Sequence, residues 1–181
     1  SGKITISNNI IQYCSSGVRT YISGYNQERV IISYNQIQHN GTGISCTNGL
    51  AKITHNLISS NGTGINLSGD WNNLMDIRYN TIISNDLGIY YDGSYYSYST
   101  RVAVNYNNIY NNTSYDLKLG YGTIGMTLDA TNNWWGTTDT KLIDGHIYDY
   151  YDDYRLGKVN YSPLLISEDG PSNYVPMASA D

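Results

Sequence analysis

Phenylalanine is absent from this chain, and cysteine, histidine and proline are scarce. The 181 residues include no Phe, two Cys, three His and three Pro, whereas 20 Tyr provide most of the aromatic rings. Only 14% of the residues are charged, so Glu and Lys, which favour helices, are few. Tyr, Thr, Ile and Val favour strands, and Asn and Gly favour turns. The composition therefore indicates a strand-rich protein, and the length suits one domain with a sizeable core.

Charge and hydropathy argue against two kinds of partner. The formal net charge is −5 and no basic cluster occurs, so nucleic acid is not expected as a partner, because proteins bind phosphates through Lys and Arg. No apolar run approaches the roughly 20 residues of a membrane-spanning helix. Residues 1–3 show no signal peptide and directly precede an expected strand, which suggests a processed product or an excised fragment.

One short phrase recurs six times along the chain. Each copy is apolar, polar, polar or aromatic, Asn, variable and apolar in turn, and the copies occupy residues 6–11, 32–37, 53–58, 77–82, 104–109 and 130–135. Their asparagines are Asn9, Asn35, Asn56, Asn80, Asn107 and Asn133, so the spacing runs from 21 to 27 residues. A period of this length is typical of repeat architectures.

Two further columns extend the repeat. The first contains Val18, Ile44, Ile65, Ile89 and Leu117, and the second contains Thr20, Cys46, Leu67, Tyr91 and Leu119. Apolar and polar residues alternate within each segment, as in a sheet with one buried face, and segments 40–43 and 61–64 carry turn signals. Each coil is therefore predicted to hold three short strands, with like side chains stacked between coils.

The six repeated asparagines are interpreted as a structural ladder. A side-chain amide has donors and an acceptor, so amides stacked at the strand spacing of about 4.8 Å can bond from coil to coil. Cys14 and Cys46 fall at different places in adjacent coils. Because a disulfide demands a specific geometry, two small residues in tight positions are favoured over a disulfide bond.

This repeat resembles the right-handed parallel β-helix superfamily of pectate lyase-like, alginate epimerase-like and secreted surface proteins, over about residues 4–135. The resemblance implies an all-β, right-handed parallel β-helix of about five to six coils, and the handedness comes from the resemblance alone. The ending at residues 132–137, Asn-Asn-Trp-Trp-Gly-Thr, resembles the terminus of β-helix domains in bacterial and archaeal adhesin-like cell-surface proteins.

The chain is expected to divide into coils at 1–136, a C-terminal cap at 137–168 and an extended tail at 169–181. Apolar residues from Asp139 to about Tyr151 have near-helical spacing, which predicts a short capping helix, although Gly145 weakens it. Residues 159–165 are predicted to form an extended strap. Trp134 and Trp135 are expected to close the core, with a sugar platform as the alternative.

The clearest charged cluster in the coils contains Lys52, Asp76, Arg78 and Asp129, at outward positions beside the first apolar column. In an enzyme, a lyase or an epimerase, these four are the candidate catalytic residues, with Asp76 as a base or calcium ligand and Arg78 as a uronate-binding group. An ordinary cross-strand ion pair between Lys52 and Asp76 is favoured instead. The motifs of alginate epimerases and pectate lyases, which catalysis on this fold requires, are missing from the chain.

No cofactor is expected. The three histidines, His39, His55 and His146, have no metal-ligand spacing. The acidic run Asp149, Asp152 and Asp153 is a weak candidate for a Ca²⁺ site, and a solvated helix end is favoured there.

Aromatic residues gather at the predicted bends. Tyr34, His55, Tyr79 and Tyr106 precede the ladder asparagine in four consecutive coils, which predicts a stacked ribbon. The third bend varies in length and carries Tyr25, Trp71, Tyr95, Tyr96, Tyr98 and Tyr121. These six residues are candidates for binding a glycan or a partner protein, because insertions in a solenoid map to one side and Tyr and Trp suit wet interfaces. Packing against the outside of the solenoid is the alternative.

The favoured function is a non-catalytic extracellular module of a cell-surface, adhesin-like or filament-forming structural protein. The first coil carries no capping segment, so self-assembly or contact with neighbouring coils is expected at that end. The alternatives are a polysaccharide-acting enzyme and a carbohydrate-binding module attached to one.

Overall fold

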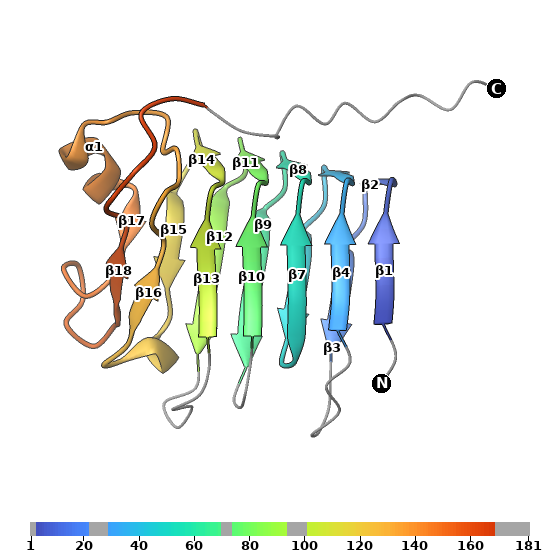
Figure 1. Ribbon diagram of the computed structural model, residues 1–181, viewed down its shortest axis with the longest axis horizontal. Coiled ribbons are helices and arrows are strands. Elements are labelled where there is room, and N and C mark those ends of the chain that lie inside the picture. The colour runs from blue at the N-terminus through green and yellow to red at the C-terminus, as the bar shows by residue number, and fades with distance from the viewer. Residues whose placement is uncertain (1–2, 22–28, 70–73, 94–100, 169–181) are drawn as a thin grey trace.

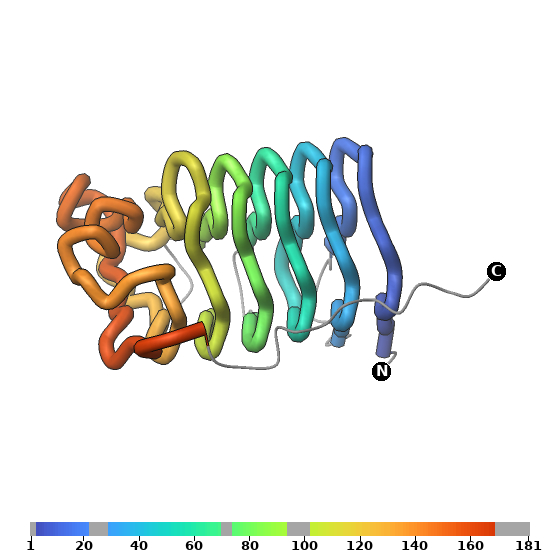
Figure 2. Tube along the Cα trace, turned by 90° about the horizontal axis from the view of Figure 1, so that it is seen from above, coloured from blue at the N-terminus to red at the C-terminus, as the bar shows by residue number. Residues whose placement is uncertain are grey.

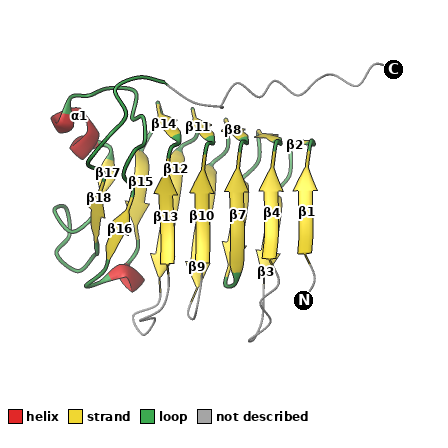
Figure 3. Ribbon diagram, in the orientation of Figure 1, coloured by secondary structure: helices red, strands yellow, loops and turns green. Residues whose placement is uncertain are grey.

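The structure is a computed structural model that describes residues 3–21, 29–69, 74–93 and 101–168. In these ranges the chain winds into a parallel β-helix with three strands in each coil, as the repeat predicts (Figure 1). Figure 2 shows the coils stacked along one axis, with the C-terminal cap at the end opposite the N-terminus. The chain makes about five coils, and Figure 3 shows helix only at the cap end of the described chain.

Three parallel sheets form from the described residues. Sheet A contains, in spatial order, β1 (Lys3–Ser7), β4 (Arg29–Ser33), β7 (Leu50–Thr54), β10 (Leu74–Arg78), β13 (Arg101–Asn105), β16 (Thr127–Asp129) and β18 (Lys158–Asn160). Sheet B contains β2 (Ile10–Gln12), β5 (Gln36–Gln38), β8 (Leu57–Ser59), β11 (Thr81–Ile83) and β14 (Asn108–Tyr110). Sheet C contains β3 (Ser16–Tyr21), β6 (Thr42–Thr47), β9 (Thr63–Gly69), β12 (Leu87–Gly93), β15 (Tyr115–Leu119) and β17 (Ile147–Tyr148).

The core is made of columns of like residues, because each strand pairs in register with its counterpart one coil away. Ile32, Ile53 and Ile77 stack on sheet A, and all three are completely buried. On sheet C, Ile44 pairs with Ile65 and Ile65 with Ile89. These columns confirm the predicted inward positions, and burial of their aliphatic side chains is the main favourable contribution to folding.

Single residues with positive φ make the bends between the sheets. Between sheets A and B these residues are Asn8, Tyr34, His55, Tyr79, Tyr106 and Asn132, with φ between 57° and 60°. Left-handed backbone is unfavourable for Tyr and His, although Asn tolerates it, so neighbouring interactions must hold it in place at the four tyrosine and histidine positions. The asparagine that follows each of them supplies those interactions.

The predicted asparagine ladder is confirmed. The backbone amide and Nδ2 of Asn56 both donate to Oδ1 of Asn80 at 3.0 Å, and Nδ2 also reaches the carbonyl oxygen of Ile32 at 2.9 Å. Asn80 repeats the pattern with Asn107, where the amide bond is 2.9 Å and the side-chain bond is 3.0 Å. Each buried amide therefore links three successive coils and satisfies backbone carbonyls at the bend.

A second asparagine ladder lies between sheets B and C, and the sequence interpretation missed it. Asn40 donates to Asn61, Asn61 to Asn85 and Asn85 to Asn112, each through a side-chain bond of 3.0 Å. Residues 40–41 and 61–62 lie at the bends before β6 and β9, as their turn signals indicate, but Asn40 and Asn61 are buried inside the coil. The recurrence of Asn five residues after four of the first-ladder asparagines was the available signal.

The C-terminal cap is less helical than its spacing predicts. Helix α1 covers only Thr140–Gly145, and the side chain of Asp139 caps it by accepting a hydrogen bond from the backbone amide of Lys141. Ile147 then adds to sheet C beside Leu117, so the predicted helix ends early because an unpaired strand edge accepts the chain. The first residues of the predicted strap likewise form β18, which pairs with β16 on sheet A.

Candidate functional site

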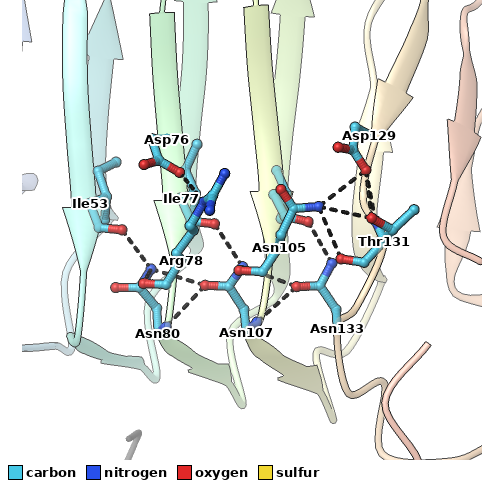
Figure 4. Close-up of polar contacts among 11 residues, drawn as sticks. Ile53, Asp76, Ile77, Arg78, Asn80, Asn105, Asn107, Asp129, Thr131 and Asn133 are labelled. Atoms are coloured by element: carbon cyan, nitrogen blue, oxygen red, sulfur yellow. Dashed lines mark hydrogen bonds and ion pairs between the residues drawn. The ribbon is translucent and has the colours of Figure 1, made fainter. Parts of the chain in front are cut away.

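The predicted charged face lies on the outer surface of sheet A. In-register pairing places Lys52 beside Asp76, and Ala103 separates Asp76 from Asp129. Asp76 forms an ion pair with Arg78 on its own strand (Figure 4), rather than the expected cross-strand pair with Lys52. The four residues therefore share one surface, but the charge of Asp76 is balanced within β10.

One oxygen of Asp129 accepts three hydrogen bonds from neighbouring donors. Its Oδ1 accepts hydrogen bonds from the hydroxyl of Thr131 at 2.8 Å, from the backbone amide of Thr131 at 3.1 Å and from Nδ2 of Asn105 at 3.1 Å (Figure 4). Partial burial opposes ionisation, but these bonds and the charge of Arg78 outweigh it and lower the pKa of Asp129. An acid held in the ionised form at neutral pH is poorly suited to donate a proton.

The predicted aromatic ribbon is present. Its ring centroids are 4.8 Å apart between Tyr34 and His55, 5.3 Å between His55 and Tyr79, and 5.6 Å between Tyr79 and Tyr106. Because successive rings cover one another's faces, the two inner rings present mainly their edges to solvent. A sugar ring stacks on an open aromatic face, so this geometry suits bend packing better than glycan binding.

His55 has an unusual environment within the ribbon. Its Nδ1 is buried and has no hydrogen-bond partner among the described residues. Burial between two tyrosine rings, together with the positive charge of Lys52, lowers the pKa of His55, so its neutral form is favoured. The ring therefore acts as an uncharged stacking element of the ribbon.

A different set of aromatic and cationic side chains gathers at the outer face of sheet C, and we name it the sheet C patch. It contains Tyr115, Lys118, Tyr121, Tyr148 and Arg155. The rings of Tyr115 and Tyr148 are 5.2 Å apart, and Nζ of Lys118 lies 4.9 Å from the Tyr148 ring centroid. Cζ of Arg155 lies 4.8 Å from the ring centroid of Tyr121, which is 60% exposed. The patch therefore combines open aromatic surface with two cationic groups.

Electrostatic contacts hold the patch together. Arg155 donates through Nη2 to Asp153 at 2.7 Å and to the hydroxyl of Tyr121 at 3.1 Å. The hydrogen bonds and charge of Arg155 lower the pKa of Asp153 to about 2. Loss of solvent contact and the nearby Asp153 carboxylate raise the pKa of Tyr148. The patch is thus an ordered surface in which the hydroxyl of Tyr148 stays protonated at neutral pH.

Only part of the predicted aromatic binding set can be located. Tyr121 lies in the sheet C patch, whereas Tyr25, Trp71, Tyr95, Tyr96 and Tyr98 lie outside the described residues. Of the two tryptophans expected to close the core, Trp135 is buried with its ring edge-on to Tyr161 at 6.4 Å. Trp134 is half-buried and bridges to Asn108 of sheet B. Neither tryptophan offers a fully open ring face.

The acidic run of the cap does not converge on one point. Both oxygens of Asp149 accept backbone amides, from Tyr151 at 3.0 Å and Val159 at 2.7 Å. Asp153 pairs with Arg155 instead. Within the ranges that the structure covers, no three His, Cys, Asp or Glu side chains are grouped so that they could hold a metal ion. The predicted weak Ca²⁺ site therefore has no geometric support.

A cleft opens in the cap, and we name it the cap cleft. It has a volume of about 810 Å³ and its walls come from α1, β17, the turn after β17, β18 and the segment that follows β18. Its lining contains Thr140, Asp144, Gly145, Ile147, Asp149, Tyr151, Asp152, Val159, Asn160, Tyr161, Ser162 and Leu164. The predicted catalytic face on sheet A contributes none of these residues.

The chain belongs to the right-handed β-helix family, whose model, described as a right-handed beta helix region, matches residues 1–135. This match confirms the expected fold and its handedness. Searches of the curated proteins and of the solved structures gave no match. Among the described helices, none is long and apolar enough to cross a membrane. The comparisons define a fold and assign no activity to it.

Proposed function

We propose that the protein is a non-catalytic, extracellular β-helix module of a cell-surface, adhesin-like or filament-forming structural protein, and that it contacts glycans or partner proteins through exposed tyrosines. The sheet C patch carries this proposal. It presents Lys118 and Tyr148 on strands β15 and β17 of sheet C, with Tyr121 just after β15, and the second asparagine ladder runs along the edge of this sheet. Aromatic rings with cationic neighbours are typical of protein and glycan contact surfaces.

The state of the charged face on sheet A supports a non-catalytic role. A glycosidase needs two carboxyl groups at a defined separation, one of which can give up a proton. Asp76 is neutralised by Arg78, and Asp129 is held in the ionised form by Thr131 and Asn105. These interactions keep both carboxylates within the sheet's own hydrogen-bond and ion-pair network.

The N-terminal edge supports the assembly part of the proposal. In the described chain, strands β1, β2 and β3 pair on one side only, whereas β17 and β18 continue sheets C and A at the other end. Ile4 and Ile10 at the N-terminal edge are 50% and 59% exposed. An exposed edge of this kind is a template for another strand or coil, so this edge is the proposed contact for neighbouring coils or a second copy.

The test separates binding from catalysis. The purified chain is screened against a glycan array and against a polysaccharide turnover panel that includes uronans. Binding without turnover is expected. Replacing Tyr121 with Ala should lower the affinity for the bound glycan or partner about tenfold. Tyr13→Ala is the matched control, because Tyr13 is 77% exposed in the first coil. Turnover that disappears in Asp76→Ala or Arg78→Ala would instead establish the enzyme alternative.

A further inference from the structure

The cap cleft has an apolar floor and polar walls. Ile147 and Val159 form the floor as buried members of β17 and β18, and Leu164 adjoins them. Tyr151 and Tyr161 contribute rings, and Tyr151 is 80% exposed. A volume of about 810 Å³ falls within the usual range of roughly 300–1,000 Å³ for small-ligand sites. The cleft is thus large enough for a ligand of more than one ring.

Two acceptor atoms in the walls have no hydrogen-bond partner among the described residues. Asp144 accepts the hydroxyl of Tyr161 through Oδ1 at 2.7 Å, and no described donor reaches its Oδ2. Asp152 accepts the backbone amide of Asp149 through Oδ2 at 3.1 Å, and no described donor reaches its Oδ1. The bonds that are made fix the two carboxyl groups in orientation, while each keeps one oxygen for a ligand.

The charge of the lining selects the kind of ligand. The lining contains three carboxylates, from Asp144, Asp149 and Asp152, and no Lys or Arg. The neighbouring Lys158 lies over tyrosine rings instead, with Nζ 4.7 Å from the Tyr150 centroid and 5.7 Å from that of Tyr151. An anionic ligand such as a uronate would be repelled, whereas an ammonium group would be attracted to the unpaired oxygens.

We propose that the cap cleft binds a saccharide that carries free amino groups. Its ammonium groups meet the unpaired oxygens of Asp144 and Asp152, and an apolar sugar face lies on the apolar floor beside the rings of Tyr151 and Tyr161. Hydroxyl and amide groups of Thr140, Asn160 and Ser162 surround the cleft, which suits a polyhydroxylated ligand better than a lone lysine head group. The inference rests on the proposed non-catalytic function, and it names the chemical class of one ligand that such a module would bind.

The test uses titration calorimetry of the whole chain at low salt with a glucosamine tetramer as the probe. Three comparison ligands are its N-acetylated counterpart, a galacturonate tetramer and a lysine-rich peptide. The glucosamine tetramer should bind. Its N-acetylated counterpart should bind about tenfold more weakly, because the charge-assisted hydrogen bonds are lost. Galacturonate should show no binding. Tighter binding of the lysine peptide than of the glucosamine tetramer would overturn the saccharide assignment.

Matched variants locate the site. Asp144→Asn and Asp152→Asn each keep an acceptor oxygen for the internal hydrogen bond and remove one charge, so the cap should stay folded. Each should weaken tetramer binding about tenfold, whereas Asp86→Asn, which removes an exposed charge from a bend in the coils, should not. Unchanged affinity in both cleft variants, or no tetramer binding at all, overturns the inference. Tetramer binding that is lost in Tyr121→Ala but kept in both cleft variants would overturn the inference and leave the proposed function standing. Turnover of the tetramer would overturn the proposed non-catalytic function instead.

Discussion

Asp116 ends the second asparagine ladder by standing in for the next asparagine after Asn112. Its Oδ1 accepts Nδ2 of Asn112 at 2.7 Å and the backbone amide of Asn112 at 3.3 Å. Its Oδ2 lies 3.8 Å from Nδ1 of His146, at the end of α1, and Asp116 is only 4% exposed. The carboxylate thus joins the last full coil to the cap, at the cost of a buried charge.

Replacing Asp116 with Asn should therefore stabilise the protein at neutral pH, because the ladder acceptor remains and the buried charge is removed. Burial raises the pKa of Asp116 above its ordinary value of 3.8, against the opposing effects of Asn112 and His146. A raised carboxyl pKa means that the folded state holds this proton more tightly than the unfolded state does. The wild-type protein therefore loses stability as the pH rises from 3.8 through the raised pKa of Asp116. The advantage of the variant should shrink as the pH falls toward 3.8.

Urea unfolding of the two proteins between pH 4 and pH 7 checks this expectation. Asp116→Ala is the comparison that removes the acceptor as well as the charge. It should lower the free energy of unfolding by about 1–3 kcal/mol, because the buried backbone amide of Asn112 loses its acceptor and Nδ2 of Asn112 loses its shortest hydrogen bond. A stability difference between wild type and Asp116→Asn that does not vary with pH would contradict the proposed role of the charge.

Position within the first ladder should determine the cost of losing an asparagine. Asn80 is completely buried and bonds to the coils on both sides, so Asn80→Ala should lower the free energy of unfolding by about 3 kcal/mol. Asn9 is exposed and bonds to Asn35 on one side only. Asn9→Ala should cost about 1 kcal/mol or less in the same urea titration. Equal losses would argue against the ladder as a source of stability.

The first ladder was predictable because one residue type recurs at one place in a regular phrase. Asn35, Asn56 and Asn80 each stand between an apolar strand and the next strand. The second ladder was missed because Asn40-Gly41 and Asn61-Gly62 are also strong turn signals, and the turn interpretation accounts for them without burial. A turn and a buried ladder are compatible at these positions, because the backbone carbonyls at a bend need side-chain donors.

The cap and the sheet C patch could not be predicted in the same way. Strands β17 and β18 have only two and three residues, which is too short for a period of two to be visible. They exist because Ile147 and Val159 pair with edges built by residues about 30 positions earlier. The patch brings Tyr115, Tyr121 and Arg155 together from three segments of the chain, so no local spacing signals it.

Glycine is required at positions where neighbouring coils approach each other closely. A Cβ atom added at Gly64 would lie 2.6 Å from the carbonyl oxygen of Gly88, so Gly64→Ala should lower the free energy of unfolding by about 1–3 kcal/mol. Gly145, in the last turn of α1, has nothing within 4 Å of an added Cβ. Gly145→Ala should leave stability unchanged or raise it by up to about 1 kcal/mol. Thermal unfolding of the two variants side by side gives the comparison.

The two cysteines should differ sharply in reactivity, because both are free thiols in different environments. Cys14 is exposed in the first coil, whereas Cys46 is completely buried between Thr20 and Leu67 on sheet C. Burial raises the pKa of Cys46 to about 11, so almost no thiolate forms there at neutral pH. Iodoacetamide should therefore modify Cys14 within minutes and Cys46 only after unfolding, as measured by mass spectrometry of the intact protein. Rapid labelling of both thiols in the native chain would show that the coils open near Cys46. Labelling of neither thiol in the absence of a reductant would show that the two cysteines form a disulfide, which would contradict the structure.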